Sequence, residues 1–331
     1  MVNPIEQYLR EHYGPHSVIT WAEFIRCALY TPEIGYYTRA KERVGKSEES
    51  DFYTATTVGP LFGRLILDAC RTLLPDETLQ DYSFVEIAVE KGRHVLQGIE
   101  HPFKEIIELP LGSELKIPPK AIVFANEWLD AQPFERLIFK DGAWKLRCVQ
   151  ITETELQESL RELPIDFPNR QRLPQTAPDG YELDVPYDTC PALRGIASQP
   201  WQGLFLTFDY GMHWEDLCTA RPSGTARGYR HHQLVTDLLK HPGETDITCH
   251  VIWDWLAEEL RNNGFENPQL QKQEAFFMHH AKEEIGRVIT RQAGNFSQEK
   301  AKLMELLHPN HMGAQFQVLY GKRLHADRKS N

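Results

Sequence analysis

Four short apolar runs, each bounded by polar turns, constrain the fold of this chain more than any other feature. They are SFVEIAV from Ser83, EIIEL from Glu105, AIVFAN from Ala121 and GLFLTFDY from Gly203. Runs of this length and composition are typical of strands buried on both faces, as in a parallel sheet. Because helical patterns are interleaved with the runs, the chain is expected to adopt an α/β fold with a mostly parallel sheet.

Several local signals define the elements around these strands. Thr20 and Glu23 have the spacing of a capping box ahead of an amphipathic helix. Pro60 suits the first turn of a further helix. Residues 134–149 form two alternating runs joined at Asp141-Gly142, which predicts a β-hairpin.

The later part of the chain has weaker signals. Residues 164–188 contain five prolines and are expected to form a loop or insertion. A helix carrying Val251, Ile252 and Trp255 is expected to close at Gly264. The resulting organisation has four parts: an N-terminal helical segment packed on the core (1–80), a first part of the core with the hairpin (81–150), an insertion or linker (151–200), and a second part of the core with C-terminal helices and a strand (201–331).

Composition narrows the class of protein. The 331 residues include 36 basic and 47 acidic side chains, for a formal net charge of −11, which argues against bulk nucleic-acid binding. No apolar stretch approaches the roughly 18 residues of a membrane span, and the first residues do not resemble a secretion signal. Six scattered cysteines without a CxxC pair indicate reduced thiols in the cytoplasm and no structural zinc site. The adjacent histidines at 231–232 and 279–280 lack a third ligand at fixed spacing, so no metal is expected.

Three of the expected strands end in polar groups. Glu86 lies in the first strand, Asn126 and Glu127 end the third, and Asp209 ends the fourth. Ligands of parallel sheets bind at the carboxyl ends of the strands. These side chains therefore predict a binding pocket at one edge of the sheet.

A series of longer motifs resembles one family. The motifs are DFYTATTVGPLFG from Asp51, FANEWLDAQP from Phe124, DYG from Asp209, GTARGYRHH from Gly224, PGETDITCHV from Pro242, QEAFF from Gln273 and MGAQFQVL from Met312. From about residue 20 to 320 they are similar, in the same order, to the MidA-like family of S-adenosylmethionine (SAM)-dependent methyltransferases. That family includes mitochondrial complex I assembly factors that methylate protein arginine. The resemblance implies a Rossmann-like class I methyltransferase sheet with an N-terminal helical segment and an inserted hairpin, SAM as cofactor, and a protein substrate or assembly partner.

The cofactor loop departs from the family pattern. The family's motif after the first strand resembles ExGPGxG, in which glycines let the backbone approach the cofactor. Glu86 and Gly92 match it, whereas Ala88 and Glu90 stand where the first two glycines are expected. A side chain at Glu90 would crowd the methionine part of the cofactor unless the loop is rebuilt.

The segment after this loop is also short. Only 40 positions separate Glu86 from Asn126, where the family fits roughly another strand–helix unit. Glu108 lies 22 residues past Glu86, near the ~20-residue offset of a carboxylate that holds the ribose hydroxyls. An equally good alignment makes EIIEL the family's third strand and leaves no ribose ligand.

The resemblance and the residue types together suggest site residues. Asp51 lies where the family's N-terminal segment lines the cofactor pocket, and Asn126 could orient the substrate or the amino group of the cofactor. Glu127 and Asp130 could grip a guanidinium through charge-assisted hydrogen bonds and hold its nitrogen against the methyl group. The alternative for residues 126–130 is a loop that only caps the following helix. The expected cofactor-binding set is Asp51, Glu86, Gly92, Glu108 and Asn126, and the expected catalytic set is Asn126, Glu127 and Asp130.

Other function classes stay open at this point. An inactive methyltransferase homologue that binds a protein partner is favoured by the altered glycines, and the intact NEWLDAQP and DYG segments favour retained chemistry. A small-molecule methyltransferase is also compatible with the sequence. A dehydrogenase fits less well, because the residues after the first strand do not match a dinucleotide-binding loop.

Overall fold

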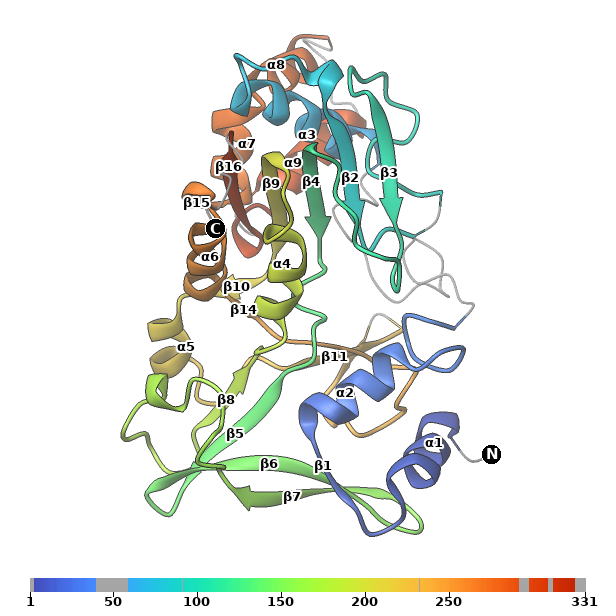
Figure 1. Ribbon diagram of the computed structural model, residues 1–331, viewed down its shortest axis with the longest axis vertical. Helices are drawn as coiled ribbons and strands as arrows, with labels where there is room; N and C mark the ends of the chain where they lie inside the picture. The colour runs from blue at the N-terminus through green and yellow to red at the C-terminus, as the bar shows by residue number, and fades with distance from the viewer. Residues whose placement is uncertain are drawn as a thin grey trace. The chain divides into compact units, whose positions relative to one another are not determined.

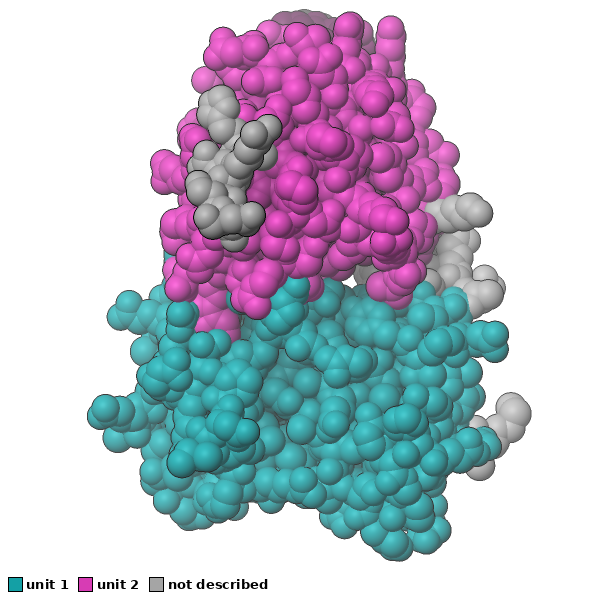
Figure 2. Space-filling model, in the orientation of Figure 1, with its two compact units in different colours: residues 1–52, 129–191, 212–252 teal, residues 53–128, 192–211, 253–331 magenta. Residues whose placement is uncertain are grey.

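A computed structural model describes residues 3–39, 59–90, 92–231, 233–291, 298–308 and 312–324. The chain divides into two compact units, each assembled from separated segments (Figure 2). Unit 1 comprises residues 1–52, 129–191 and 212–252, and unit 2 comprises residues 53–128, 192–211 and 253–331. The four-part organisation expected from the sequence stays a prediction.

Unit 2 contains a six-stranded sheet in the order β15-β16-β9-β4-β2-β3 (Figure 1). The strands are β2 (Ser83–Ile87), β3 (Glu105–Leu109), β4 (Lys120–Asn126), β9 (Gln202–Asp209), β15 (Glu266–Lys272) and β16 (Gln317–Arg323). The pairs β2–β3, β2–β4 and β4–β9 are parallel, and β16 is antiparallel to both of its neighbours. The four expected strands therefore lie in one Rossmann-like sheet.

Burial of these strands follows the expectation with one exception. All residues of β2 are buried, and β4 and β9 are exposed only partly at their ends. The expectation that EIIEL is buried on both faces is wrong, because Glu105 is exposed and residues 106–108 are only partly buried. The physical reason is that β3 is an edge strand and has a neighbour on one side alone.

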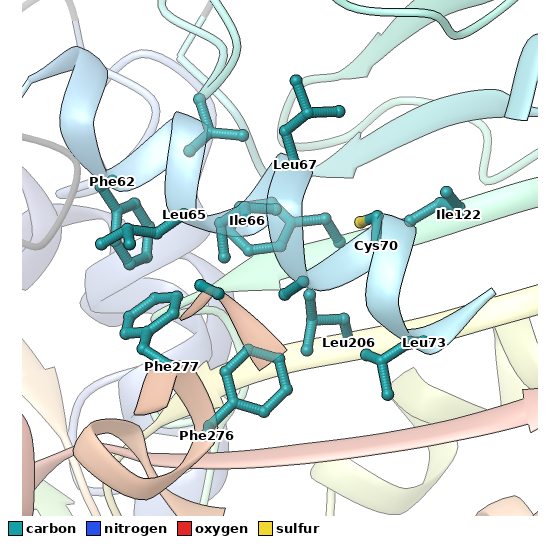
Figure 3. Close-up of a cluster of buried hydrophobic side chains, with 14 of the residues drawn as sticks. Phe62, Leu65, Ile66, Leu67, Cys70, Leu73, Ile122, Leu206, Phe276 and Phe277 are labelled. Carbon is teal, nitrogen blue, oxygen red and sulfur yellow. The ribbon is translucent and has the colours of Figure 1, made fainter. Parts of the chain in front are cut away.

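Helices cover both faces of this sheet. One face packs against α3 (Pro60–Leu73), α7 (Gln273–His280), α8 (Lys282–Thr290) and α9 (Gln298–Leu307). Figure 3 shows side chains of α3, such as Phe62 and Cys70, against Ile122, Leu206 and Phe277. On the other face, α6 (Trp253–Asn262) packs against β15 and β16, and the Phe205 ring of β9 lies 6.4 Å from that of Phe265, which follows α6. Helix α4 (Thr189–Ala197) precedes β9. A 3-10 turn, η2 (Leu79–Asp81), precedes β2.

A buried arginine on β16 fastens this second face. The Arg323 guanidinium donates hydrogen bonds of 2.6–2.7 Å to the carbonyl oxygens of Ala197, Gln199, Trp201 and Asn263. It also lies over the Trp201 and Phe265 rings, 5.0 and 4.7 Å from their centroids. Burial lowers the pKa of Arg323, but the planar, delocalised guanidinium stays charged in proteins. One side chain therefore joins β16 to the end of α4, the start of β9 and the end of α6.

Unit 1 is built on a separate antiparallel sheet. Its order is β1-β6-β5-β8, with β7 also paired to β6. The strands are β1 (Val18–Thr20), β5 (Glu135–Lys140), β6 (Ala143–Ile151), β7 (Leu156–Glu162) and β8 (Glu182–Val185). The predicted hairpin is confirmed as β5–β6. Asp141 and Gly142 at its turn both have positive φ, 54° and 77°, as a two-residue hairpin turn requires.

Helices α1 (Pro4–Tyr13) and α2 (Trp21–Tyr30) complete the core of unit 1. The Asn3 side chain caps α1, and Thr20 and Glu23 form the predicted capping box of α2. A second, small sheet joins β11 (Arg227–Arg230), β12 (Gln233–Val235) and β13 (Asp246–Thr248) in the order β12-β11-β13. Shorter elements are β10 (Gly211–Met212), α5 (Trp214–Ala220), β14 (Val251–Ile252) and the 3-10 turn η3 (Arg170–Arg172).

Two further local expectations need correction. Residues 164–188, expected to form a loop or insertion, are not loop throughout, since they include η3 and β8, whose Leu183, Asp184 and Val185 are buried. Val251 and Ile252 belong to β14, and helix α6 begins only at Trp253. Both residues are β-branched and suit a strand better than a helix.

Candidate functional site

The carboxyl ends of the parallel strands bring several predicted residues to one edge of the unit 2 sheet. Glu86 of β2 pairs in register with Phe124 of β4, two residues before Asn126. Asn126 in turn pairs with Phe208 of β9, next to Asp209. Because paired strands lie about 4.8 Å apart, Glu86, Asn126 and Asp209 occupy neighbouring positions on this edge.

Glu86 is a buried carboxyl that holds the following loop. Its exposed fraction is 5%, and its Oε2 accepts a 2.7 Å hydrogen bond from the backbone N–H of Val95. Burial, with a smaller contribution from the neighbouring Glu108 carboxylate, raises the pKa of Glu86 to about 8. At neutral pH this side chain is therefore mostly protonated, and one of its oxygens is already used within the protein.

The loop after β2 keeps a glycine-like conformation without its first glycine. Ala88 has a φ of 56°, in the left-handed region that favours glycine, and its N–H donates to the Leu109 carbonyl. The Glu90 side chain is 34% exposed and lies 3.6 Å from the Arg93 guanidinium. Gly92 has a φ of 76°, and its N–H donates a 2.9 Å hydrogen bond to Oε2 of Glu108.

Replacing Ala88 with glycine should raise the free energy of unfolding by about 1 kcal/mol, because an L side chain in the left-handed region costs roughly that amount. Urea unfolding followed by circular dichroism measures the change. The control is Ala301→Gly in helix α9, which should lower stability by about 1 kcal/mol. Equal destabilisation by the two variants would show that Ala88 carries no strain.

Glu108 lies beside Glu86 at the edge strand. The two residues are direct register partners on β3 and β2. The sequence left two alignments open, one with Glu108 as the ribose carboxylate and one with EIIEL as the family's third strand. In the structure, EIIEL pairs directly with β2, the first strand of this sheet along the chain. One oxygen of Glu108 accepts from Gly92, and a carboxylate has further lone pairs on both oxygens.

Asn126 and Glu127 form the most unusual pair on this edge. Asn126 Nδ2 donates a 2.8 Å hydrogen bond to Glu127 Oε1, while Asn126 Oδ1 is buried and has no hydrogen-bond partner. Glu127 has a φ of 49°, and its N–H donates to the Phe208 carbonyl. A buried acceptor without a donor costs about 1–3 kcal/mol, and strained backbone of this kind clusters at functional sites. Asn126 therefore offers an unused acceptor to a ligand.

Asp130 belongs to unit 1, where the backbone around it is firmly held. The Asp130 carbonyl accepts from the Cys249 N–H at 3.0 Å, and the Tyr30 hydroxyl donates to the Ala131 carbonyl at 2.7 Å. Asp130 itself is 6% exposed. Desolvation by burial raises the pKa of Tyr30, with further contributions from Asp246 and Asp130.

Sequence reasoning missed the tyrosines that surround this segment. The Tyr37 hydroxyl donates a 2.6 Å hydrogen bond to Asp246, and the Tyr30 and Tyr37 rings stack 5.6 Å apart. Burial raises the pKa of Tyr37 well above its ordinary value. No local pattern marks either tyrosine, because their partners are about 100 and 209 positions away.

Other expectations have simpler outcomes. Asp51 lies outside the described residues. Among the residues that the structure places, no group of three or more His, Cys, Asp or Glu side chains could hold a metal ion. None of the helices in the described segments is long and apolar enough to cross a membrane.

A mostly parallel sheet with helices on both faces and polar residues at its carboxyl edge defines a Rossmann-like class of fold. One solved structure with a similar fold comes from Burkholderia thailandensis and is described as a superfamily member and "likely methyl transferase" bound to S-adenosyl-homocysteine. It matches with a TM-score of 0.85 and 20% identity, over 98% of this chain and 95% of its own. A native structure of an uncharacterised protein of that superfamily from the same organism matches with a TM-score of 0.81 and 19% identity, over 96% and 91%.

A match to a family model, made from the sequence, shows the family of this chain. Residues 60–269 match the model of a family described as "Putative S-adenosyl-L-methionine-dependent methyltransferase". Since the match spans more than half of the 331 residues, the chain belongs to that family. A comparison with curated proteins gave no match.

Proposed function

We propose that this protein transfers a methyl group from SAM to a protein side chain, arginine by its resemblance to the MidA-like family. The observation that carries the proposal is the buried, unpartnered Oδ1 of Asn126 at the carboxyl edge of the sheet. An acceptor in this state binds a donor of a ligand without first losing an internal hydrogen bond. The ammonium group of SAM is such a donor.

Several residues fit a cofactor at this edge. Asn126 Oδ1 would accept from the ammonium group, and Glu108, beside β2, would accept from the ribose hydroxyls. Gly92 and the left-handed Ala88 would let the loop backbone run close to the cofactor, and Asp51 is proposed to line the pocket. Glu86 would act indirectly by fixing the loop through Val95. When bound, SAM supplies a methyl group activated on a sulfonium.

We assign binding of the side chain that receives the methyl group to two acidic residues. Glu127 accepts a hydrogen bond from Asn126, and we propose that its carboxylate also accepts from a guanidinium of the substrate. Asp130 follows three residues later and is proposed for the same role. Holding the acceptor nitrogen in line with the methyl carbon is the main contribution such residues can make.

The six free cysteines favour a reducing compartment, and we propose the cytoplasm.

The alternative is an inactive homologue that serves as a protein-binding or assembly factor. Ala88 and Glu90 in place of glycines favour this alternative. The partly exposed Glu90 side chain, 3.6 Å from the Arg93 guanidinium, favours retained cofactor binding, because it lies along the surface of the loop.

Calorimetry with SAM and S-adenosylhomocysteine separates the two. We expect micromolar binding by the wild type and at least about tenfold weaker binding by Asn126→Ala, because a hydrogen bond to a charged group is worth about 1.5–3 kcal/mol. The matched control is Asn262→Ala at the exposed end of α6, which should bind like the wild type. Silence of the wild type at millimolar cofactor would instead support the inactive homologue.

The acceptor is tested separately with radiolabelled SAM. Arginine-containing peptides should be labelled, whereas peptides with lysine at the same positions should not. Labelling of small molecules alone would favour the small-molecule methyltransferase.

A further inference from the structure

A basic cluster in unit 1 is not used by the proposed methyl transfer. It consists of Arg221, Arg227 and His250, all within residues 212–252. Arg227 of β11 pairs in register with Thr248 of β13, and the His250 N–H donates to Thr225 Oγ1 at 3.2 Å. Arg227 and His250 therefore lie on adjacent chain segments of the small sheet.

The turn that carries the two arginines is rigidly built. The fully buried Asp184 carboxylate accepts from the N–H groups of Thr225 and Ala226, at 2.6 and 2.8 Å. A Cβ atom on Gly224 would lie 2.2 Å from that carboxylate, so only glycine lets the turn approach it. At the other end, the Tyr181 hydroxyl accepts from the Arg221 N–H at 3.1 Å.

The positive charge of this turn is left without a matching carboxylate. Asp184, which holds this turn, also accepts from Arg136 Nε at 2.9 Å, so both of its oxygens already accept hydrogen bonds within the protein. In the described part of the chain, no carboxylate forms an ion pair with Arg221 or Arg227, and Arg227 Nη1 bonds only to the carbonyl of Ala226. The turn therefore carries positive charge in a protein whose formal net charge is −11.

His250 adds an unused polar atom to the cluster. Its Nδ1 is buried and has no hydrogen-bond partner. Burial, with smaller contributions from the positive charges of Arg221 and Arg227, lowers the pKa of His250 to about 4, whereas Asp184 acts in the opposite direction. Both guanidinium groups therefore lie within electrostatic reach of the ring.

We propose that Arg221, Arg227 and His250 form a binding site for an oxyanion, either a phosphate or a carboxylate group of a ligand. Guanidinium groups suit both anions, because their N–H donors match two oxygens at once. The imidazole Nδ1 supplies a further polar contact. The three residues belong to unit 1, and the test below measures anion binding directly, without a methyl-transfer assay.

The test measures binding of inorganic phosphate and, separately, of succinate to the full chain by NMR titration of the histidine ring signals. The His250 signal should shift saturably, and its pKa should rise by about 1 or more in the presence of the anion, as an adjacent negative charge requires. Arg227→Gln should weaken binding at least about tenfold, the loss of one charge-assisted pair. If the protein binds phosphate more tightly than succinate, the natural ligand carries a phosphate group; the opposite preference indicates a carboxylate group.

The matched control is Arg161→Gln, which removes the same charge from an exposed position on β7 of unit 1. It should leave anion binding unchanged. The circular dichroism spectrum and melting temperature of each variant show that it is folded, and Arg227→Lys provides a second, charge-conserving variant with an intermediate affinity. The proposal is overturned if neither anion shifts His250 at tens of millimolar, or if Arg161→Gln weakens binding as much as Arg227→Gln.

Discussion

Replacing Arg323 with methionine should lower the free energy of unfolding of unit 2 by about 3 kcal/mol. The substitution leaves four backbone carbonyl oxygens without their donor, and each lost hydrogen bond of this kind is worth about 1 kcal/mol. It also removes the cation from above the Trp201 and Phe265 rings. Urea unfolding monitored by tryptophan fluorescence measures the loss.

Two further variants separate charge from geometry. Arg323→Lys keeps the charge but lacks the planar fork, so it should lose about 2 kcal/mol. Lys322→Met on the same strand removes a cation with a single 3.3 Å contact to the Leu73 carbonyl and should cost less than about 1 kcal/mol. If Lys322→Met and Arg323→Met were equally destabilising, Arg323 would not be the fastening point described above.

Replacing Glu86 with glutamine should stabilise the protein by about 4 kcal/mol at pH 8 and make no difference at pH 4. The folded protein retains the Glu86 proton up to a pKa of about 8, whereas the unfolded chain releases it near 4.5. Stability from this group is therefore greatest below pH 4.5 and is lost as the pH rises toward 8. Glutamine stays neutral at every pH and can still accept a hydrogen bond from the Val95 N–H. The variant therefore does not lose stability as the pH rises toward 8.

The measurement is the free energy of unfolding of both proteins across this pH range. Glu266→Gln, at an exposed position of β15, serves as the control and should leave the pH dependence unchanged. Parallel curves for the wild type and Glu86→Gln would mean that Glu86 is ionised in the folded protein.

The central strands could be predicted from sequence because burial on both faces produces uninterrupted apolar runs. β2, β4 and β9 are of this kind. β7 and β15 escaped notice because most of their side chains are polar, and β15 also contains Pro268 and an irregular register. Their strand character comes from pairing with neighbours, which a local pattern does not record.

The candidate site was predictable only as far as strand ends reveal it. Glu86 and Asn126 could be placed on one edge because each belongs to a run that ends there. The bond from Val95 to Glu86 depends on the path of the intervening loop, which no periodicity specifies. The sequence also could not predict that Asn126 Oδ1 has no hydrogen-bond partner, because asparagine also caps helices and forms turns.

The position of β16 has a consequence for how the chain is made. This strand, residues 317–323, lies between β9 and β15, although both of those precede it in sequence. While the ribosome is still adding the last residues, β9 and β15 each have an open edge, and such edges promote pairing with other chains. Unit 2 can close its sheet only after residue 323 has emerged, so its folding is completed after most of the chain has been synthesised. Termination between β15 and β16 would leave both of these edges open and would therefore favour aggregation.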